Sequence, residues 1–292
     1  MRNDLRRGAV HALYAAAAFS ITGACIKAAS ATTPNEMVVF VRCAVSLLAL
    51  LPWLLRHGSQ AVHTQRLGGH LWRSAFGVAA MYCFFYAIAQ LPLASAMLLT
   101  YSTPLWLPFI AWFWIGERPP FVVFPAALVG LAGIALIVKP GAGSFAGLGW
   151  PAGIGLAAGI LAACAMVSIR RISDSEPAER IVFYFALLAT LISAVPMLWA
   201  WRTPGWHALL LLSGAGITAT VGQLHLTRAY SWAPAARVGP FTYFSVIFSA
   251  LLAWLFWGEH LDRWAALGAL LVVVTCVLVG WQRSATPVDA TT

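Results

Sequence analysis

The sequence predicts an all-α integral membrane protein with ten transmembrane helices, built as two five-helix repeats of inverted topology with both termini cytoplasmic. Three observations support this prediction. Hydrophobic residues make up 61% of the 292 residues and charged residues only 9%, whereas about 25% of the residues in ordinary soluble domains are charged. Apolar runs of roughly twenty residues, long enough to cross a hydrocarbon core of about 30 Å, follow one another along the chain. One long apolar run also occurs twice.

The repeated run is 94–117, which aligns without a gap with 236–259 at an offset of 142 positions. The identical pairs include Thr100/Thr242, Tyr101/Tyr243, Ala111/Ala253, Trp112/Trp254, Gly116/Gly258 and Glu117/Glu259. Because each half has an odd number of helices, the second copy enters the membrane from the opposite side, as in inverted-topology repeats.

The individual spans follow from the apolar runs and from the Pro, Gly and charged residues that bound them. In chain order they are 9–29, 36–56, 71–91, 94–115, 120–138, 149–170, 178–200, 207–229, 236–257 and 262–282. The predicted organisation is a cytoplasmic N-terminus (1–8), a first repeat (9–140), a second repeat (141–282) and a cytoplasmic tail (283–292).

The first span is the one that resembles a cleavable signal peptide, because arginines precede it and Ala29-Ser30-Ala31 follows it. Its apolar run is longer than a usual signal core, and it has a partner at an offset of 143. The matching pairs include Leu13/Leu156, Ala15/Ala158, Ile26/Ile169, Pro34/Pro177, Glu36/Glu179 and Phe40/Phe183. We therefore interpret it as a true span.

Orientation follows from the basic residues, which accumulate on the cytoplasmic side of membrane proteins. With ten spans and the N-terminus inside, thirteen arginines lie on the inner side and four basic residues on the outer side, while Arg42 lies within a span. The inner set is Arg2, Arg6, Arg7, Arg56, Arg66, Arg73, Arg118, Arg170, Arg171, Arg180, Arg228, Arg237 and Arg283. The outer set is Lys27, Lys139, Arg202 and Arg263.

The same bias explains the net charge of +9, so a nucleic-acid partner is not expected. The five cysteines lie in apolar runs without a CxxC or Cys/His cluster, and we expect neither disulfides, a metal site nor a cofactor. The expected partners are the lipid bilayer and a small-molecule substrate, and no oligomer is required.

The motif W-x-x-x-G-E ends both the fourth and the ninth span, as Trp112–Glu117 and Trp254–Glu259. Together with ten spans, the duplication and Arg42 in the second span, this pattern resembles the EamA-type transporters of the drug/metabolite transporter superfamily. The aromatic third span looks most like bacterial inner-membrane exporters of aromatic amino acids. The resemblance implies export from the cytoplasm by alternating access of the two halves, in the bacterial inner membrane.

Breaks in the fourth and ninth spans are the first candidates for a substrate site, since interrupted helices at matching places mark transporter sites. Proline removes a backbone donor, and nearby hydroxyls can satisfy the freed carbonyls. An ordinary proline kink is the alternative. The substrate-binding candidates in this group are Tyr101, Ser102, Thr242, Tyr243 and Ser245, whereas Pro104 and Pro240 are gating or structural candidates.

The third and eighth spans supply the other candidates. Tyr82, Phe85 and Tyr86 form an aromatic stripe, suited to an aromatic or apolar solute or else to helix packing. Gln223 and His225 place polar groups in the eighth span, where a histidine serves as a proton carrier, a substrate contact or a neutral helix contact.

Three further charged residues have gating or structural interpretations. Arg42 attracts a carboxylate or holds backbone carbonyls, and Glu117 and Glu259 are predicted to end their helices on opposite membrane faces as possible gates. All nine acidic residues lie at span ends, in loops or in tails. Proton- and sodium-driven carriers usually need a carboxylate in the path, so we expect a facilitator or coupling through His225.

The predicted function is therefore export of amino acids, aromatic or apolar ones, and of related metabolites. Export of another metabolite or drug-like solute is the alternative, and a non-transport membrane scaffold is a remote one. An intramembrane enzyme is not expected, because paired aspartates, HExxH and a Ser/Lys or Ser/His pair are missing from the spans.

Overall fold

The computed structural model describes residues 4–90, 99–100, 102–138, 149–258 and 263–281. Every regular element among these residues is helical, which confirms the all-α prediction. The first half contains α1 (Leu5–Ala29), α2 (Asn35–Ala49), α3 (Leu51–His57), η1 (Gly58–Ala61), α4 (Leu67–Gln90), α6 (Thr103–Ile115) and α7 (Val123–Val138). The second half contains α8 (Gly149–Ile172), α9 (Ala178–Ala194), α10 (Met197–Ala200), α11 (Trp206–Trp232), α12 (Ala235–Val238), η2 (Gly239–Tyr243), α13 (Phe244–Trp257) and α14 (Arg263–Trp281).

Each predicted span overlaps at least one of these helices. Among the described residues, five helical segments are long and apolar enough to cross a membrane: Leu5–Ala29, Asn35–His57, Gly149–Ile172, Trp206–Trp232 and Ala235–Phe256. The second and seventh spans are each divided in two, at Leu50, two residues before Pro52, and at Val195, directly before Pro196. Proline removes a backbone donor and disturbs the preceding turn, which explains why both divisions fall there.

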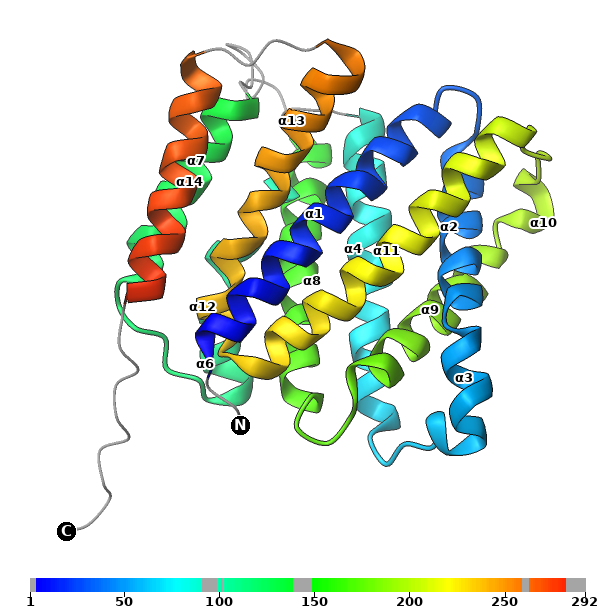
Figure 1. Cartoon of the computed structure of the whole chain (residues 1–292), viewed down its shortest axis with the longest axis horizontal. Helices are drawn as coiled ribbons and strands as arrows, with labels where there is room; N and C mark the ends of the chain where they lie inside the picture. The colour runs from blue at the N-terminus through cyan, green and yellow to red at the C-terminus, as the bar shows by residue number, and fades with distance from the viewer. Residues whose placement is uncertain (1–3, 91–98, 101, 139–148, 259–262, 282–292) are drawn as a thin grey trace.

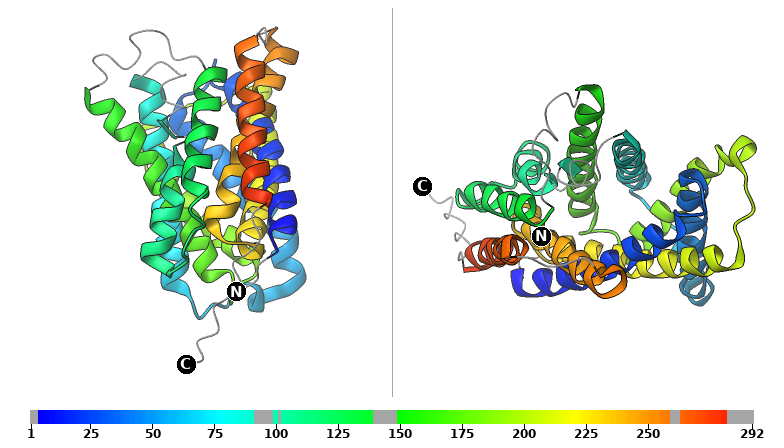
Figure 2. Two further views of the ribbon diagram at one scale, coloured as in Figure 1. Left: turned by 90° about the vertical axis from the view of Figure 1, so that its left-hand side faces the viewer. Right: turned by 90° about the horizontal axis from the view of Figure 1, so that it is seen from above.

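Successive helical passages alternate in direction between the two ends of the bundle, and α1 and α11 are strongly tilted relative to α2 and α14 (Figure 1). α1 begins and α14 ends at the same end of the bundle, which we call the base (Figures 1 and 2). α1 runs away from the base, whereas α8, its counterpart in the second half, runs toward it. The connections from α3 to α4, from α8 to α9 and from α11 to α12 all lie at the base.

Helix packing repeats when the two halves are exchanged. α1 packs on α11 as α8 packs on α4, and α1 contacts α13 as α8 contacts α6. α2 contacts α11 as α9 contacts α4, while α2–α9 and α7–α14 pair each helix with its own counterpart. The packing therefore has the pattern of two structurally equivalent halves joined about a twofold relation.

The surface of the bundle is apolar. Phe113 is 96% exposed and Leu198 86% exposed, as suits a surface that meets lipid rather than water. Trp150, Trp199 and Trp206 are also exposed, and each lies at or near a helix end, where an indole can anchor in the headgroup layer.

Glycines allow the closest helix contacts. A Cβ atom on Gly159 of α8 would lie 2.7 Å from Ser102 Oγ and 3.0 Å from Leu99 O. One on Gly133 of α7 would lie 2.7 Å from the carbonyl oxygen of Gly268 in α14. Small residues at such crossings let two backbones approach closely, which is the main route to helix association in a membrane.

We therefore expect Gly133→Ala to destabilise the protein by roughly 1–3 kcal/mol, because the added methyl group must push α14 away. The matched control is Gly153→Ala in α8, where a Cβ atom would meet nothing within 4 Å. That substitution should be neutral or slightly stabilising, because alanine favours helix. Unfolding of both variants in detergent measures the difference, and equal stability of the two would contradict this view of the α7–α14 contact.

Candidate functional site

The ninth span is interrupted where the sequence predicted a break. α12 gives way to the 3₁₀ turn η2 at Gly239, and α13 starts at Phe244. Thr242 Oγ1 donates to Gly239 O at 2.7 Å and Ser245 Oγ to Thr242 O at 2.7 Å. Ser20 of α1 donates to Ser245 O at 2.8 Å. Hydroxyl groups thus satisfy carbonyls at the break, as a non-aqueous surrounding requires.

The fourth span shows a related arrangement at the start of α6. Ser102 Oγ donates to Leu99 O at 2.6 Å and accepts from Trp106 Nε1 at 3.1 Å. Thr103 Oγ1 donates to Gly159 O of α8 at 3.1 Å, and Pro104 is buried in the first turn. Each break is therefore bonded to the first helix of the opposite half. Tyr101 lies outside the described residues.

Tyr243 lies away from the other break residues. Its side chain is fully buried, and its hydroxyl donates to Ala127 O of α7 at 3.2 Å. A Cβ atom on Gly130 would lie 2.4 Å from the Tyr243 ring, so the ring fills the space that this glycine leaves. Pro240 is likewise buried in η2.

The aromatic stripe of α4 is divided between environments. Tyr82 is half-buried and packs with Met81 against the cluster that contains Val39 and Phe185. Tyr86 is 42% exposed, and the side chain of Phe85 lies outside the described part of the chain.

Gln223 and His225 lie on nearly opposite faces of α11, because two residues advance a helix by about 200°. Gln223 Oε1 accepts from Arg73 Nη2 of α4 at 3.0 Å. The Nδ1 atom of His225 lies 2.9 Å from that of His11 in α1, and the rings of Tyr14 and His225 are 5.1 Å apart. His225 therefore has a histidine neighbour that sequence reasoning did not pair with it.

Arg73 is the site residue that sequence reasoning missed, because it had been counted among the inner-side basic residues. Its side chain is buried inside the bundle, with the guanidinium carbon 4.2 Å from the centre of the Phe185 ring. Arg42 reaches the same region from α2, and its Nη1 lies 3.6 Å from Met81 Sδ. One sequence signal pointed to this arrangement: Arg73 is inside the apolar run, with Gly77 one turn later on the same face.

At the base, Glu117 joins four helices. Its Oε1 accepts from Arg170 Nε of α8 at 2.7 Å, and its Oε2 accepts from the backbone N–H of Ala235 in α12 at 3.1 Å. Arg170 also donates from Nη1 to Tyr230 O and Ser231 O of α11, at 3.1 and 3.2 Å. We call this set the base clamp. Glu259, the counterpart of Glu117, lies outside the described residues.

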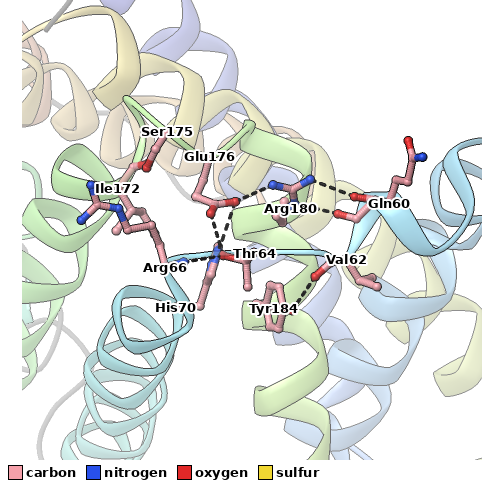
Figure 3. A network of polar contacts seen from close by, with 11 residues as sticks. Gln60, Val62, Thr64, Arg66, His70, Ile172, Ser175, Glu176, Arg180 and Tyr184 are labelled. Atoms are coloured by element: carbon pink, nitrogen blue, oxygen red, sulfur yellow. Dashed lines mark hydrogen bonds and ion pairs between the residues drawn. The ribbon is translucent and has the colours of Figure 1, made fainter.

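A second network at the base surrounds Glu176 in the α8–α9 connection (Figure 3). Thr64 donates to Glu176 at 2.6 Å, Arg180 Nη1 donates to it at 2.8 Å, and His70 Nε2 lies 3.6 Å away. Arg180 also donates to Ala61 O at 2.7 Å, so the two base connections are tied together.

Burial alone would raise the pKa of the Glu176 carboxyl group, but the hydrogen bonds from Thr64 and Arg180 and the charge of Arg180 outweigh burial and lower that pKa. A lowered folded-state pKa means that the Glu176 network contributes stability at neutral pH, which is lost as the pH falls through that value.

Cavities among the described residues also lie at the base. One of about 470 Å³ is lined by residues that include Glu179, Thr227 and Arg228, and another of about 490 Å³ by residues that include Trp53 and Arg180. Over the described residues, no group of three His, Cys, Asp or Glu side chains is placed to hold a metal ion.

Comparison with known proteins extends the picture over both halves. A model of the EamA-like transporter family matches residues 6–139 and again residues 149–281. The pseudopaline exporter CntI of Pseudomonas aeruginosa strain UCBPP-PA14 is 36% identical over 278 residues, which cover 94% of this chain and 95% of that protein.

More distant relatives bear other names. The riboflavin transporter of Vibrio cholerae is 28% identical, over 94% of this chain and 92% of its own length. The S-adenosylmethionine uptake transporter of Rickettsia felis is 24% identical, over 83% and 81%. A protein of known crystal structure, 19% identical, matches with a TM-score of 0.82 over 95% of this chain and 96% of its own, a likeness of fold alone.

The base clamp generates a stability prediction. In Glu117→Gln the guanidinium of Arg170, 2% exposed, loses its counter-charge, and we expect a loss of roughly 3–5 kcal/mol, as for other broken buried pairs. Glu179→Gln is the matched control, because its pair with Arg228 is partly exposed and should be worth only about 0–1 kcal/mol. Equilibrium unfolding in mixed micelles compares the two, and similar losses would mean that the base clamp is not an essential contact.

Proposed function

Because the chain belongs to the EamA-like transporter family, we propose that it exports a small organic metabolite from the cytoplasm by alternating access of its two halves. Family membership makes the chain a multi-pass inner-membrane transporter rather than an enzyme. The observation that carries the alternating-access proposal is the packing pattern, in which exchanging the two halves maps the α1–α11, α1–α13 and α2–α11 contacts onto α8–α4, α8–α6 and α9–α4.

The proposed topology is ten spans with both termini in the cytoplasm, so the base is the cytoplasmic end. The opposite directions of α1 and α8 support inversion of the two halves. The thirteen arginines assigned to the inner side support the orientation. Inverted halves can exchange conformations around a central site, which opens one end as the other closes.

We propose that the base clamp closes the cytoplasmic end, because Glu117 and Arg170 hold α6, α8, α11 and α12 together there. The repeat supplies an equivalent pair for the other end: an offset of 143 relates Arg170 to Lys27, and one of 142 relates Glu117 to Glu259. In this mechanism, a pairing of Lys27 with Glu259 would close the periplasmic end, and the two clamps would alternate.

The substrate proposal departs from the resemblance to aromatic amino acid exporters. The relatives described above are named for pseudopaline, riboflavin and S-adenosylmethionine, and the most similar of these three is named an exporter. These names favour a metabolite other than an aromatic amino acid, and favour export. Tyr82, Phe85 and Tyr86 remain proposed cavity residues, as do the polar residues at the two breaks.

We also propose that transport runs down the gradient of the metabolite itself. All nine acidic residues lie outside the middle of the predicted spans, which leaves no carboxylate to carry a coupling ion there. His225 is the alternative coupling residue. Its contact with His11 places two imidazole rings side by side, and either ring could carry a coupled proton.

The transport test uses the purified full-length chain in liposomes. Separate batches are preloaded with unlabelled pseudopaline, riboflavin, S-adenosylmethionine or phenylalanine, and the same solute in labelled form is added outside. We expect counterflow of pseudopaline well above that of protein-free liposomes, and none of phenylalanine. Collapsing the proton gradient should not change the rate. Counterflow of phenylalanine alone would restore the amino acid interpretation, and no counterflow of any of the four would contradict the proposed function.

A further inference from the structure

Arg73 is a buried cation that the described residues leave without a counter-charge. Its side chain is 4% exposed, and none of the described carboxylates forms an ion pair with it. Its polar contact is the hydrogen bond from Nη2 to Gln223 Oε1 at 3.0 Å, and its guanidinium lies on the Phe185 ring. A neutral amide and a ring face stabilise a desolvated charge far less than a carboxylate does.

Several buried side-chain atoms on α4 and α11 make no hydrogen bond. The Nε and Nη1 atoms of Arg73 are buried and make no hydrogen bond, and the same holds for Ser74 Oγ, the next residue along α4. Thr227 Oγ1 is also buried and unbonded, one turn beyond Gln223 on the same face of α11. Buried polar groups normally find partners, so the unused donors of Arg73 call for an explanation such as an absent ligand.

Another buried arginine, at the base, has a counter-charge. Arg170 is 2% exposed and is paired with Glu117 at 2.7 Å. Arg73 thus differs from Arg170 in having no counter-charge among the described residues. Gly77 makes room for it, because a Cβ atom there would lie 2.3 Å from Arg73 Nη1.

A second guanidinium lies further along the same face of α4. Arg73, Gly77 and Met81 recur at intervals of four residues, and Arg42 of α2 contacts Met81 through Nη1. The eight residues from Arg73 to Met81 correspond to about 12 Å along a helix. Arg42 likewise has no carboxylate partner within the part of the chain that the structure describes.

We propose that Arg73 and Gln223 bind a carboxylate group of the transported metabolite. Arg42 contacts the same carboxylic acid at a position farther from the cytoplasmic end. The inference rests on the proposed function and names the class of solute, a small carboxylic acid. One guanidinium balances one carboxylate charge, whereas a phosphate monoester would leave uncompensated charge in the bundle. The Arg73 site is closed in this structure, as expected of a carrier whose base clamp is formed.

The competing explanation is that Arg73 only joins α4 to α11 and α9. In that case removing Arg73 lowers stability, but small acids have no effect on the wild-type protein. Binding of small acids therefore distinguishes the two explanations better than stability alone does.

The binding experiment measures thermal unfolding of the purified full-length chain against increasing succinate, with dimethyl succinate as the uncharged probe and inorganic phosphate as the other anion. A ligand that binds only the folded state raises the unfolding temperature progressively above its Kd. We expect this rise with succinate and not with the ester or phosphate. Arg73→Met should weaken succinate binding by about tenfold or more, as expected for losing hydrogen bonds to a charged group.

Arg171→Gln, which removes an exposed arginine of α8, is the matched control and should keep the wild-type response. If Arg73→Met does not fold, Gln223→Glu replaces it. A carboxylate beside Arg73 should raise the unfolding temperature without ligand and abolish the response to succinate. The inference would be overturned if the wild type does not respond to succinate, or if it responds equally to the ester or to phosphate. An unchanged response to succinate in the Arg73→Met or Gln223→Glu variant would overturn it as well.

The liposome assay keeps this result separate from the proposed function. Counterflow of a solute without a carboxylate, together with no binding of succinate, would overturn the carboxylate site and leave the carrier standing. Succinate binding that depends on Arg73, without counterflow of any solute in the panel, would keep the site and overturn the carrier.

Discussion

Hydrogen-bonding groups within a bilayer must find their partners inside the protein, because lipid tails offer none, and this constraint explains most of the structure. It accounts for a fold in which every described regular element is helical. It also explains why the helix breaks carry hydroxyl residues: Ser102 and Ser245 bond to carbonyls within their own breaks. Thr103 and Ser20 extend the same bonding across the boundary between the halves.

Charged groups obey the same constraint, and their arrangement separates closing contacts from the proposed binding region. At the base, guanidiniums and carboxylates are matched, as in the base clamp and around Glu176. Deeper in the bundle, Arg73 and Arg42 meet an amide, a ring and sulfur atoms instead. A protein-supplied carboxylate would hold such a site shut, whereas a carboxylate that arrives with the solute makes the charge balance depend on binding. The inverted repeat then gives both ends equivalent ways to close.

Sequence reasoning could predict the helices, their alternation and the two breaks, because hydropathy, Pro104 and Pro240 act locally. The divisions of the second and seventh spans near Pro52 and Pro196 were not predicted. The residues that line the proposed carboxylate site were harder to predict. Span boundaries are uncertain by a few residues, so Arg73, near the start of its span, was counted as an inner-side charge. Which face of α4 turns inward depends on packing with α9 and α11, from residues more than a hundred positions away. For the same reason, the approach of His225 to His11, 214 residues apart, was not predicted. The side chains of Phe85, Tyr101 and Glu259 lie outside the part of the chain that the structure describes, so the roles predicted for them stay predictions.

The opposite orientation of the two halves is the central claim of this account, and equivalent loop positions test it directly. Thr32 follows α1 and Ser175 follows α8, at an offset of 143, and both are exposed. In a chain stripped of its five native cysteines, a membrane-impermeant maleimide should label Thr32→Cys on intact cells, and Ser175→Cys only after permeabilisation. Labelling of both positions from the same side would contradict the inverted repeat.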